Sequence, residues 1–283
     1  MDPLTTCLVL LAALLHASWH GLVKSVGNHV SILAGMGVVS GAIAACFLPF
    51  IAPLPGSAWL VIAASVPIHV AYKASLATAY RNGGLSEAYP LGRGIVPLFA
   101  SALGFLGLGE APTIGQLSAI ALVCAGLINL SAQSMKRRGA GRLIIPAAGV
   151  GLTVAVYSVL DAYGTRIAGS WLSFTVWLVI LDTAAFLLFA WASRGHLLLQ
   201  EISAIRWQVL AGGILGVCSF SVFLWAISRS PIGPVTALRE SSVLFAACIG
   251  MLLLGEERST SRILSVVLIA AGTMLLALIP HGS

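Results

Sequence analysis

The chain has 283 residues, of which 59% are hydrophobic and 8% are charged, and its net charge is +6. Soluble globular proteins carry roughly 25% charged residues, so this chain has too few polar side chains to cover the surface of a soluble protein of its size. Its basic residues lie mostly between apolar runs, which argues against a nucleic-acid surface and favours the loops of a membrane protein.

Ten apolar runs follow one another along the chain. Each is long enough to cross a membrane as a helix, which takes about 20 residues. They cover residues 4–23, 31–51, 57–80, 86–108, 113–133, 143–166, 170–192, 206–228, 232–254 and 260–280. The first run lacks the basic start of a signal peptide, so we interpret it as a helix of the mature protein. The sequence therefore predicts an all-α polytopic membrane protein with ten transmembrane helices.

A basic linker, residues 135–142, separates a first set of five runs (1–134) from a second set (143–283). Several residues of the first set recur 146 positions later in the second. These are Arg93, Phe99, Ala100, Gly109, Glu110 and Gly126, matched by Arg239, Phe245, Ala246, Gly255, Glu256 and Gly272. Because five is odd, the second copy enters the membrane from the opposite side. We therefore expect two inverted five-helix repeats, an arrangement typical of transporters with a substrate site near the midplane.

Polar side chains inside the predicted helices are the candidates for function, because a charge within a membrane usually faces a partner or a wet cavity. Helical spacing gathers them into stripes. The candidate substrate-binding residues are His16, Trp19, His20, His69, Tyr72, Lys73, Tyr89, Arg93, Tyr157, Asp161, Trp177, Trp225, Arg239 and Glu240. An interior of aromatic rings and opposite charges suits a small amphipathic zwitterion.

Structural roles compete with this interpretation. Arg93 and Arg239 are equally good candidates for ion pairs or helix capping, with Asp161 and Glu240 as their counter-charges. Each histidine is at least as well explained by a hydrogen bond between helices. Asp161, Asp182 and Glu240 are candidates for proton coupling. Prolines within or beside the predicted helices are candidate hinges for a conformational change. They are Pro90, Pro97, Pro231 and Pro234.

The sequence carries no motif typical of a metal site, a nucleotide site or a hydrolase. Five cysteines lie inside apolar runs without metal-ligand spacing, so we expect neither a disulfide framework nor a metal site. No cofactor is implied, and no nucleotide-binding GxxxxGK[ST] sequence, HExxH or GxSxG occurs. We expect a non-enzyme whose partners are a small-molecule substrate and membrane lipid. An intramembrane enzyme acting on lipid phosphates is the less favoured alternative, and the oligomeric state is left open.

Several short motifs resemble those of EamA-type transporters of the drug/metabolite transporter superfamily, including YddG-like amino-acid exporters. The motifs are Gly109-Glu110, Gly255-Glu256, His16-Ala17-Ser18-Trp19-His20 with Lys24, Tyr89-Pro90-Leu91-Gly92-Arg93-Gly94, Tyr157-Ser158-Val159-Leu160-Asp161 and Leu238-Arg239-Glu240-Ser241-Ser242. The resemblance implies a secondary carrier of the cell (inner) membrane that exports amino acids or related metabolites by alternating access. It implies a central cavity between the repeats, lined by the third, fourth, eighth and ninth helices and also by the first and sixth. A multidrug or lipid translocator on the same fold is the alternative.

The distribution of Lys and Arg predicts the orientation of the chain, because cytoplasmic loops of membrane proteins are enriched in both. One set of loops carries Lys24, Arg81, Lys136, Arg137, Arg138, Arg142, Arg194, Arg206, Arg258 and Arg262, whereas the opposite set carries Arg166 and Arg229. The first set is then cytoplasmic, and both termini lie outside the cytoplasm. A reporter that works only in the cytoplasm should be inactive when fused to the C-terminus. An active fusion would reverse this orientation.

Overall fold

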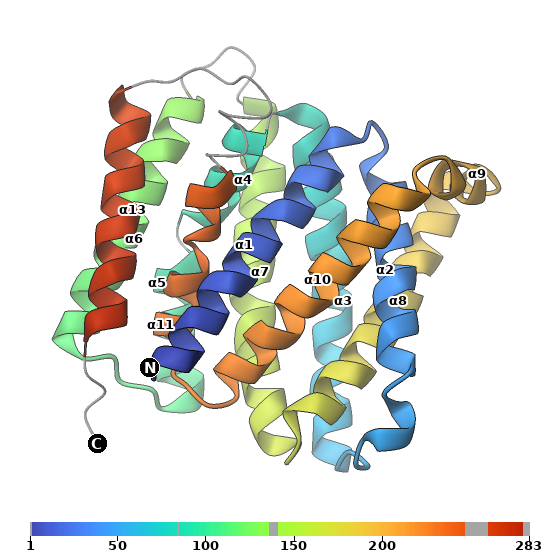
Figure 1. The fold of residues 1–283 in the computed structure, drawn as a ribbon, viewed down its shortest axis with the longest axis horizontal. Coiled ribbons are helices and arrows are strands. Elements are labelled where there is room, and N and C mark those ends of the chain that lie inside the picture. The colour runs from blue at the N-terminus through green and yellow to red at the C-terminus, as the bar shows by residue number, and fades with distance from the viewer. Residues whose placement is uncertain (1, 84, 95, 136–140, 247–259, 280–283) are drawn as a thin grey trace.

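The structure is a computed structural model that describes residues 2–83, 85–94, 96–135, 141–246 and 260–279 (Figure 1). Within these ranges the regular structure is helical, and no strand occurs. The longer helices are α1 (Pro3–Ser25), α2 (His29–Ala45), α3 (Gly56–Asn82), α6 (Ile114–Met135), α7 (Gly141–Ile167), α8 (Trp171–Arg194), α10 (Arg206–Ile227) and α13 (Thr260–Leu278). The shorter ones are η1 (Leu48–Phe50), α4 (Leu85–Arg93), α5 (Val96–Leu108), α9 (Leu197–Ala204) and α11 (Ile232–Arg239).

Eight segments of the described chain are long and apolar enough to cross a membrane. They correspond to the first eight predicted runs, and the segment for the fourth, Ala88–Leu108, combines parts of α4 and α5. The tenth run is represented by a shorter apolar helix, Ile263–Leu278. The ninth run, 232–254, begins with α11, and its last part, from residue 247, lies outside the described residues. Gly255, Glu256 and most of the basic linker also lie outside them. The prediction of an all-α polytopic membrane protein is confirmed, whereas the count of ten and the inverted repeat stay predictions.

Two of the predicted runs are interrupted after an arginine. Helix α4 ends at Arg93 and α5 begins at Val96, and α11 ends at Arg239 before the chain becomes helical again at residue 242. Pro97 explains the first interruption, because a proline lacks the N–H that would bond to the carbonyl four residues earlier and its ring clashes with that carbonyl. Both arginines thus lie in the last turn of a short helix, where the negative end of the helix dipole favours a cation.

The two halves of the chain pack against each other through matching helix pairs. In Figure 1, α6 and α13 lie side by side at one edge of the molecule and α2 and α8 at the opposite edge. Between them, α1 packs on α10 and α3 packs on α7. Exchanging each helix of the first half for its predicted counterpart in the second leaves the α6–α13 and α2–α8 pairs unchanged and turns the α1–α10 pair into the α3–α7 pair. This pattern is the one that an inverted repeat would produce.

Two glycines allow α6 and α13 to approach closely. A Cβ atom on Gly126 would lie 2.8 Å from the Ser265 carbonyl oxygen, and one on Gly272 would lie 2.7 Å from that of Ala119. Small residues at such crossings are typical of helix pairs in membranes. The two glycines are 146 residues apart, and each packs on the helix that carries the other.

The outer surface of the helices is apolar. Large hydrophobic side chains point away from the protein, among them Leu106 with 79% and Ile145 with 83% of its surface exposed. Soluble proteins rarely expose so many large apolar side chains to water. They are the surface that lipid covers, which supports a multi-pass membrane protein.

At the end of the molecule near the α10–α11 loop, one carboxylate joins three segments. Gly109, with φ +68°, reverses the chain after α5 in a left-handed conformation that glycine adopts without strain. The next residue, Glu110, accepts a 2.7 Å hydrogen bond from the Ile232 backbone N–H and pairs with Arg166 at 2.6 Å. Arg166 also donates to the Ile227 carbonyl. These contacts hold the N-terminus of α11 against the ends of α5 and α7. They also help to position Arg239, which lies at the other end of α11.

Gly272→Leu should destabilise the protein, because the new side chain would collide with the backbone of α6. Overpacking of this kind costs about 1–3 kcal/mol, which we expect as a lower midpoint of thermal unfolding in detergent. Gly107→Leu is the matched control, since a Cβ atom at Gly107 meets nothing within 4 Å. Equal midpoints for the two variants would contradict the close α6–α13 crossing.

Candidate functional site

A cavity of about 120 Å³ lies between the two halves of the chain. Helices α1, α2 and α3 of the first half and α7, α8, α10 and α11 of the second line it. Of the predicted site residues, those on its wall are His16, Trp19, His69, Tyr72, Lys73, Tyr157, Asp182 and Arg239. Its other walls are mostly apolar or small side chains. The cavity therefore combines aromatic rings, cations and a carboxylate in an otherwise apolar enclosure.

Behind the cavity wall, an ion pair joins the halves. The Arg93 Nη1 atom lies 2.8 Å from Glu240 Oε1, and both side chains are shielded from solvent. The Nη2 atom of Arg93 lies 2.6 Å from His16 Nε2. The structure thus pairs Arg93 with Glu240, one of the counter-charges that the sequence analysis proposed.

His16 and His20 form a buried cluster beside this pair. The two Nε2 atoms lie 3.1 Å apart, and His20 Nδ1 lies 2.6 Å from the Tyr80 hydroxyl. Arg93 reaches one nitrogen of His16 and Trp19 Nε1 reaches the other at 3.2 Å. Arginine and tryptophan only donate hydrogen bonds, whereas a neutral imidazole accepts at one nitrogen only, so His16 accepts from one of these two donors at a time.

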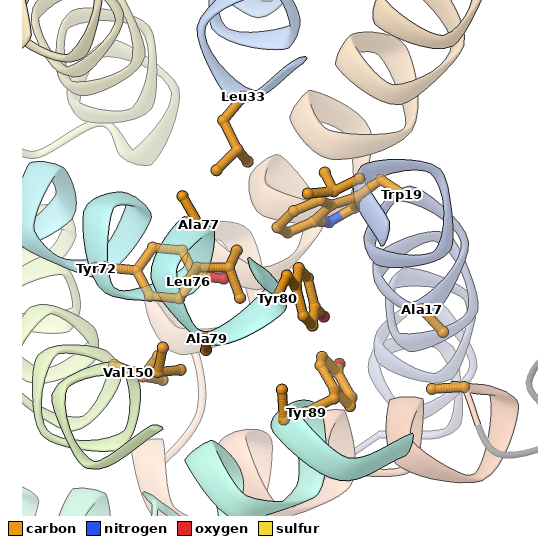
Figure 2. Packing of buried hydrophobic residues seen from close by; sticks show 14 of the residues in the cluster. Ala17, Trp19, Leu33, Tyr72, Leu76, Ala77, Ala79, Tyr80, Tyr89 and Val150 are labelled. Atoms are coloured by element: carbon orange, nitrogen blue, oxygen red, sulfur yellow. The ribbon is translucent and has the colours of Figure 1, made fainter. Parts of the chain in front are cut away.

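Figure 2 shows aromatic rings from three helices in one region of the interior: Trp19 of α1, Tyr72 and Tyr80 of α3, and Tyr89 of α4. Each of these four side chains contacts His20. The Trp19 and His20 rings stack with centroids 3.7 Å apart. The Tyr89 hydroxyl lies 2.7 Å from Ser242 Oγ, directly after the break in the second half. Tyr89 and His20 therefore support the cavity wall without lining it.

A second polar group connects α3 with α7. Asp161 is fully buried, accepts a 2.6 Å hydrogen bond from Ser65 Oγ and lies 3.0 Å from His69 Nε2. The His69 ring in turn stacks on Tyr157 with centroids 4.2 Å apart. Asp161 reaches the cavity only through His69, so it orients a lining ring rather than offering a free carboxylate.

On another wall of the cavity, Lys73 of α3 pairs with Asp182 of α8. The Lys73 ammonium lies 2.5 Å from Asp182 Oδ2 and 5.1 Å from the Phe186 ring centroid. The second carboxylate oxygen, Oδ1, is buried without a hydrogen-bond partner. Asp182 thus keeps acceptor capacity on the cavity wall.

Arg239 differs from its counterpart Arg93. It is 3% exposed, and its guanidinium carbon lies 3.9 Å from the Phe223 ring centroid. Its Nη2 atom lies 3.5 Å from the Tyr157 hydroxyl. Among the described residues, no carboxylate forms a salt bridge with it.

Two tryptophans predicted for the site lie elsewhere. Trp177 packs on Trp59, with ring centroids 5.0 Å apart, and Trp225 lies under Arg229 at 5.1 Å. Neither lines the cavity. Helical spacing placed them at suitable depths but did not tell which side of the helix faces the interior.

The predicted hinges take two forms. Pro90 lies inside α4, and Pro97 lies in the first turn of α5, directly after the break. Pro231 is the N-cap of α11, and Pro234 lies in its first turn, where a proline is well tolerated. These two prolines start a helix rather than bend one, so their hinge role depends on movement of the α10–α11 loop.

The sequence analysis missed the contribution of α2. Leu33, Met36, Gly37 and Ser40 of this helix line the cavity, but α2 carries no charge within its apolar run. Small residues in α2, such as Gly37, were the sequence signal that this helix packs closely on another one. Thr183 of α8 donates a 2.9 Å hydrogen bond to the Gly37 carbonyl oxygen, which requires close approach of the two helices.

Comparison with known proteins supports the assignment that the motifs indicated. Residues 142–278 match the EamA-like transporter family. This match supports an EamA-type transporter of the drug/metabolite transporter superfamily, and it favours a membrane transporter over an enzyme. No curated protein matches the chain.

Solved structures support the fold. A crystal structure of a protein with 16% sequence identity covers 96% of this chain and 96% of its own, with a TM-score of 0.70. At this identity the likeness concerns the fold alone. It extends over both halves, whereas the family match covers the second.

Glu240→Gln should destabilise the protein strongly, because it leaves the buried Arg93 without its counter-charge. Breaking a buried pair in this way costs about 3–5 kcal/mol, which thermal or urea unfolding in detergent would measure. Glu201→Gln is the matched control. Its pair with Arg194 is partly exposed, so its loss should cost less than about 1 kcal/mol. Equal losses in the two variants would refute the buried pair.

Proposed function

We propose that this protein is a secondary carrier that exports small amphipathic zwitterions, amino acids first, by alternating access. The observation that carries the proposal is a cavity lined by both halves of the chain, with Arg239 and Asp182 on its wall among aromatic rings. An amino acid offers a carboxylate, an ammonium group and often an apolar side chain, which are complementary to these three features.

The charges around the cavity favour a substrate without net charge. Apart from the histidines, the three cations Lys73, Arg93 and Arg239 equal in number the three carboxylates Asp161, Asp182 and Glu240. A zwitterion leaves this balance unchanged, whereas a net cation or anion would add an unbalanced charge within the membrane, which is costly.

Proton coupling, if it drives export, would involve Asp182 before the other candidates. Asp182 lines the cavity and has a carboxylate oxygen without a partner. Asp161 is bonded to Ser65 and His69, and Glu240 is held by Arg93. We therefore assign Asp161 and Glu240 mainly structural roles in the proposed carrier.

Alternating access would require the cavity to open toward each side of the membrane in turn. The breaks after Arg93 and Arg239 let the two segments of each interrupted helix move separately. Pro90 and Pro97 flank the first break, and Pro231 and Pro234 open the helix that leads to the second. The proposed location is the inner membrane with both termini outside the cytoplasm.

The proposal predicts counterflow of a labelled amino-acid mixture into proteoliposomes that contain the purified protein. Arg239→Ala should lose the flux because it removes from the cavity wall a guanidinium that could bind the substrate carboxylate. Arg93→Ala should lose it because it breaks the ion pair between the halves. Size-exclusion profiles would check that each variant is folded. Absence of flux for every amino acid in the parent would contradict the substrate class and direct the search to drugs and lipids.

A further inference from the structure

Arg239 is a buried cation whose hydrogen-bonding capacity is largely unused. Its Nε atom has no hydrogen-bond partner among the described residues, and its contact with the Tyr157 hydroxyl is long at 3.5 Å. Its guanidinium lies against the Phe223 ring. An arginine has five N–H donors arranged to bind a carboxylate through two parallel hydrogen bonds. Arg239 lines the cavity, so these donors are available to a bound molecule.

The sequence explains why, among the described residues, Arg239 has no carboxylate partner although Arg93 has one. Glu240 follows Arg239, but its carboxylate is bonded to Arg93. At the equivalent position after Arg93 stands Gly94, which supplies no carboxylate in return. Arg93 and Arg239 occupy equivalent positions, and in the described chain the one glutamate beside them pairs with Arg93.

The local surroundings compensate the buried charge only in part. The negative end of the α11 dipole and the cation–π contact with Phe223 both favour the charge. Neither replaces the full hydration that a guanidinium loses when it is buried. A carboxylate supplied by a ligand would complete the compensation.

We propose that Arg239 binds the carboxylate of the transported substrate and that Asp182 binds its ammonium group. This inference rests on the proposed function, because it assigns the two ends of the same cavity. Asp182 has one oxygen bonded to Lys73 and the other without a partner, so it can accept from an ammonium group without losing Lys73. The apolar part of the substrate lies against Trp19, Tyr72 and Phe220.

The two assignments make opposite predictions for substrates that lack one group. A carrier that binds both the carboxylate and the ammonium group should discriminate against an amine without a carboxylate through Arg239. It should discriminate against a carboxylate without an amine through Asp182. A purely structural role of either residue would weaken all three classes of ligand equally and leave their ratios unchanged.

The test measures inhibition of labelled amino-acid counterflow by L-phenylalanine, phenethylamine and 3-phenylpropionate. In the parent, phenylalanine should inhibit best. Arg239→Gln should weaken phenylalanine by about tenfold to a hundredfold and bring its ratio to phenethylamine near one. Arg239→Lys should fall in between, because lysine keeps the charge but not the bidentate geometry. Asp182→Asn should instead abolish the preference for phenylalanine over 3-phenylpropionate.

Arg229→Gln is the control, because Arg229 also lies on an aromatic ring but outside the cavity. It should leave all three values unchanged. An Arg239→Gln carrier that still prefers phenylalanine over phenethylamine by the parent ratio would overturn the inference while the proposed function stands.

Failure of the proposed function is recognised separately, by thermal unfolding of the parent and of Arg239→Gln with and without 3-phenylpropionate. If the parent transports no amino acid but 3-phenylpropionate raises its unfolding midpoint and not that of Arg239→Gln, the carboxylate site stands and the amino-acid substrate is wrong. If 3-phenylpropionate shifts neither protein and no flux occurs, the carboxylate site is overturned as well.

Discussion

The ion pair between Arg93 and Glu240 is the contact on which the rest of the arrangement depends. Both groups are buried among apolar helices, where an unpaired charge is strongly destabilising. The pair can form only if α4 of the first half lies against the end of α11 in the second, so it fixes how the halves meet. The histidine cluster is bonded to the same arginine, which extends this constraint to α1. The cavity lies directly beside these groups.

The breaks in the two helices connect this constraint with transport. In a continuous helix the backbone N–H and C=O groups bond to one another. At a helix end inside a membrane, the last C=O groups lack such partners, and neighbouring groups must bond to them. An arginine lies in the last turn of α4 and of α11, where its charge interacts favourably with the negative end of the helix dipole. Within the part of the chain that the structure describes, only Arg93 of the two arginines pairs with a carboxylate. The asymmetry leaves a cation on the cavity wall, and the proposed substrate site follows from it.

Much of the fold was predictable from the sequence, because apolar runs of membrane length and the spacing of charged residues depend on local composition. The stripe formed by His69, Tyr72 and Lys73 does face the cavity. The breaks were harder to predict, since proline and glycine within a membrane helix also occur as static kinks. Pairings such as Lys73 with Asp182, and the place of α2 in the wall, depend on tertiary packing that leaves little local signal. Trp177 and Trp225 show that depth in a helix does not determine direction.

The central claim is that the cavity between the halves is the path of the substrate, and cysteine accessibility tests it most directly. In a variant without the native cysteines, Ser40→Cys places a thiol on the cavity wall, whereas Ser118→Cys places one on the outer surface of α6. We predict that a charged, water-soluble thiol reagent modifies Cys at position 40 but not at position 118 in proteoliposomes, and that a transported amino acid slows the reaction. Modification at position 40 that no transported substrate slows would contradict the account.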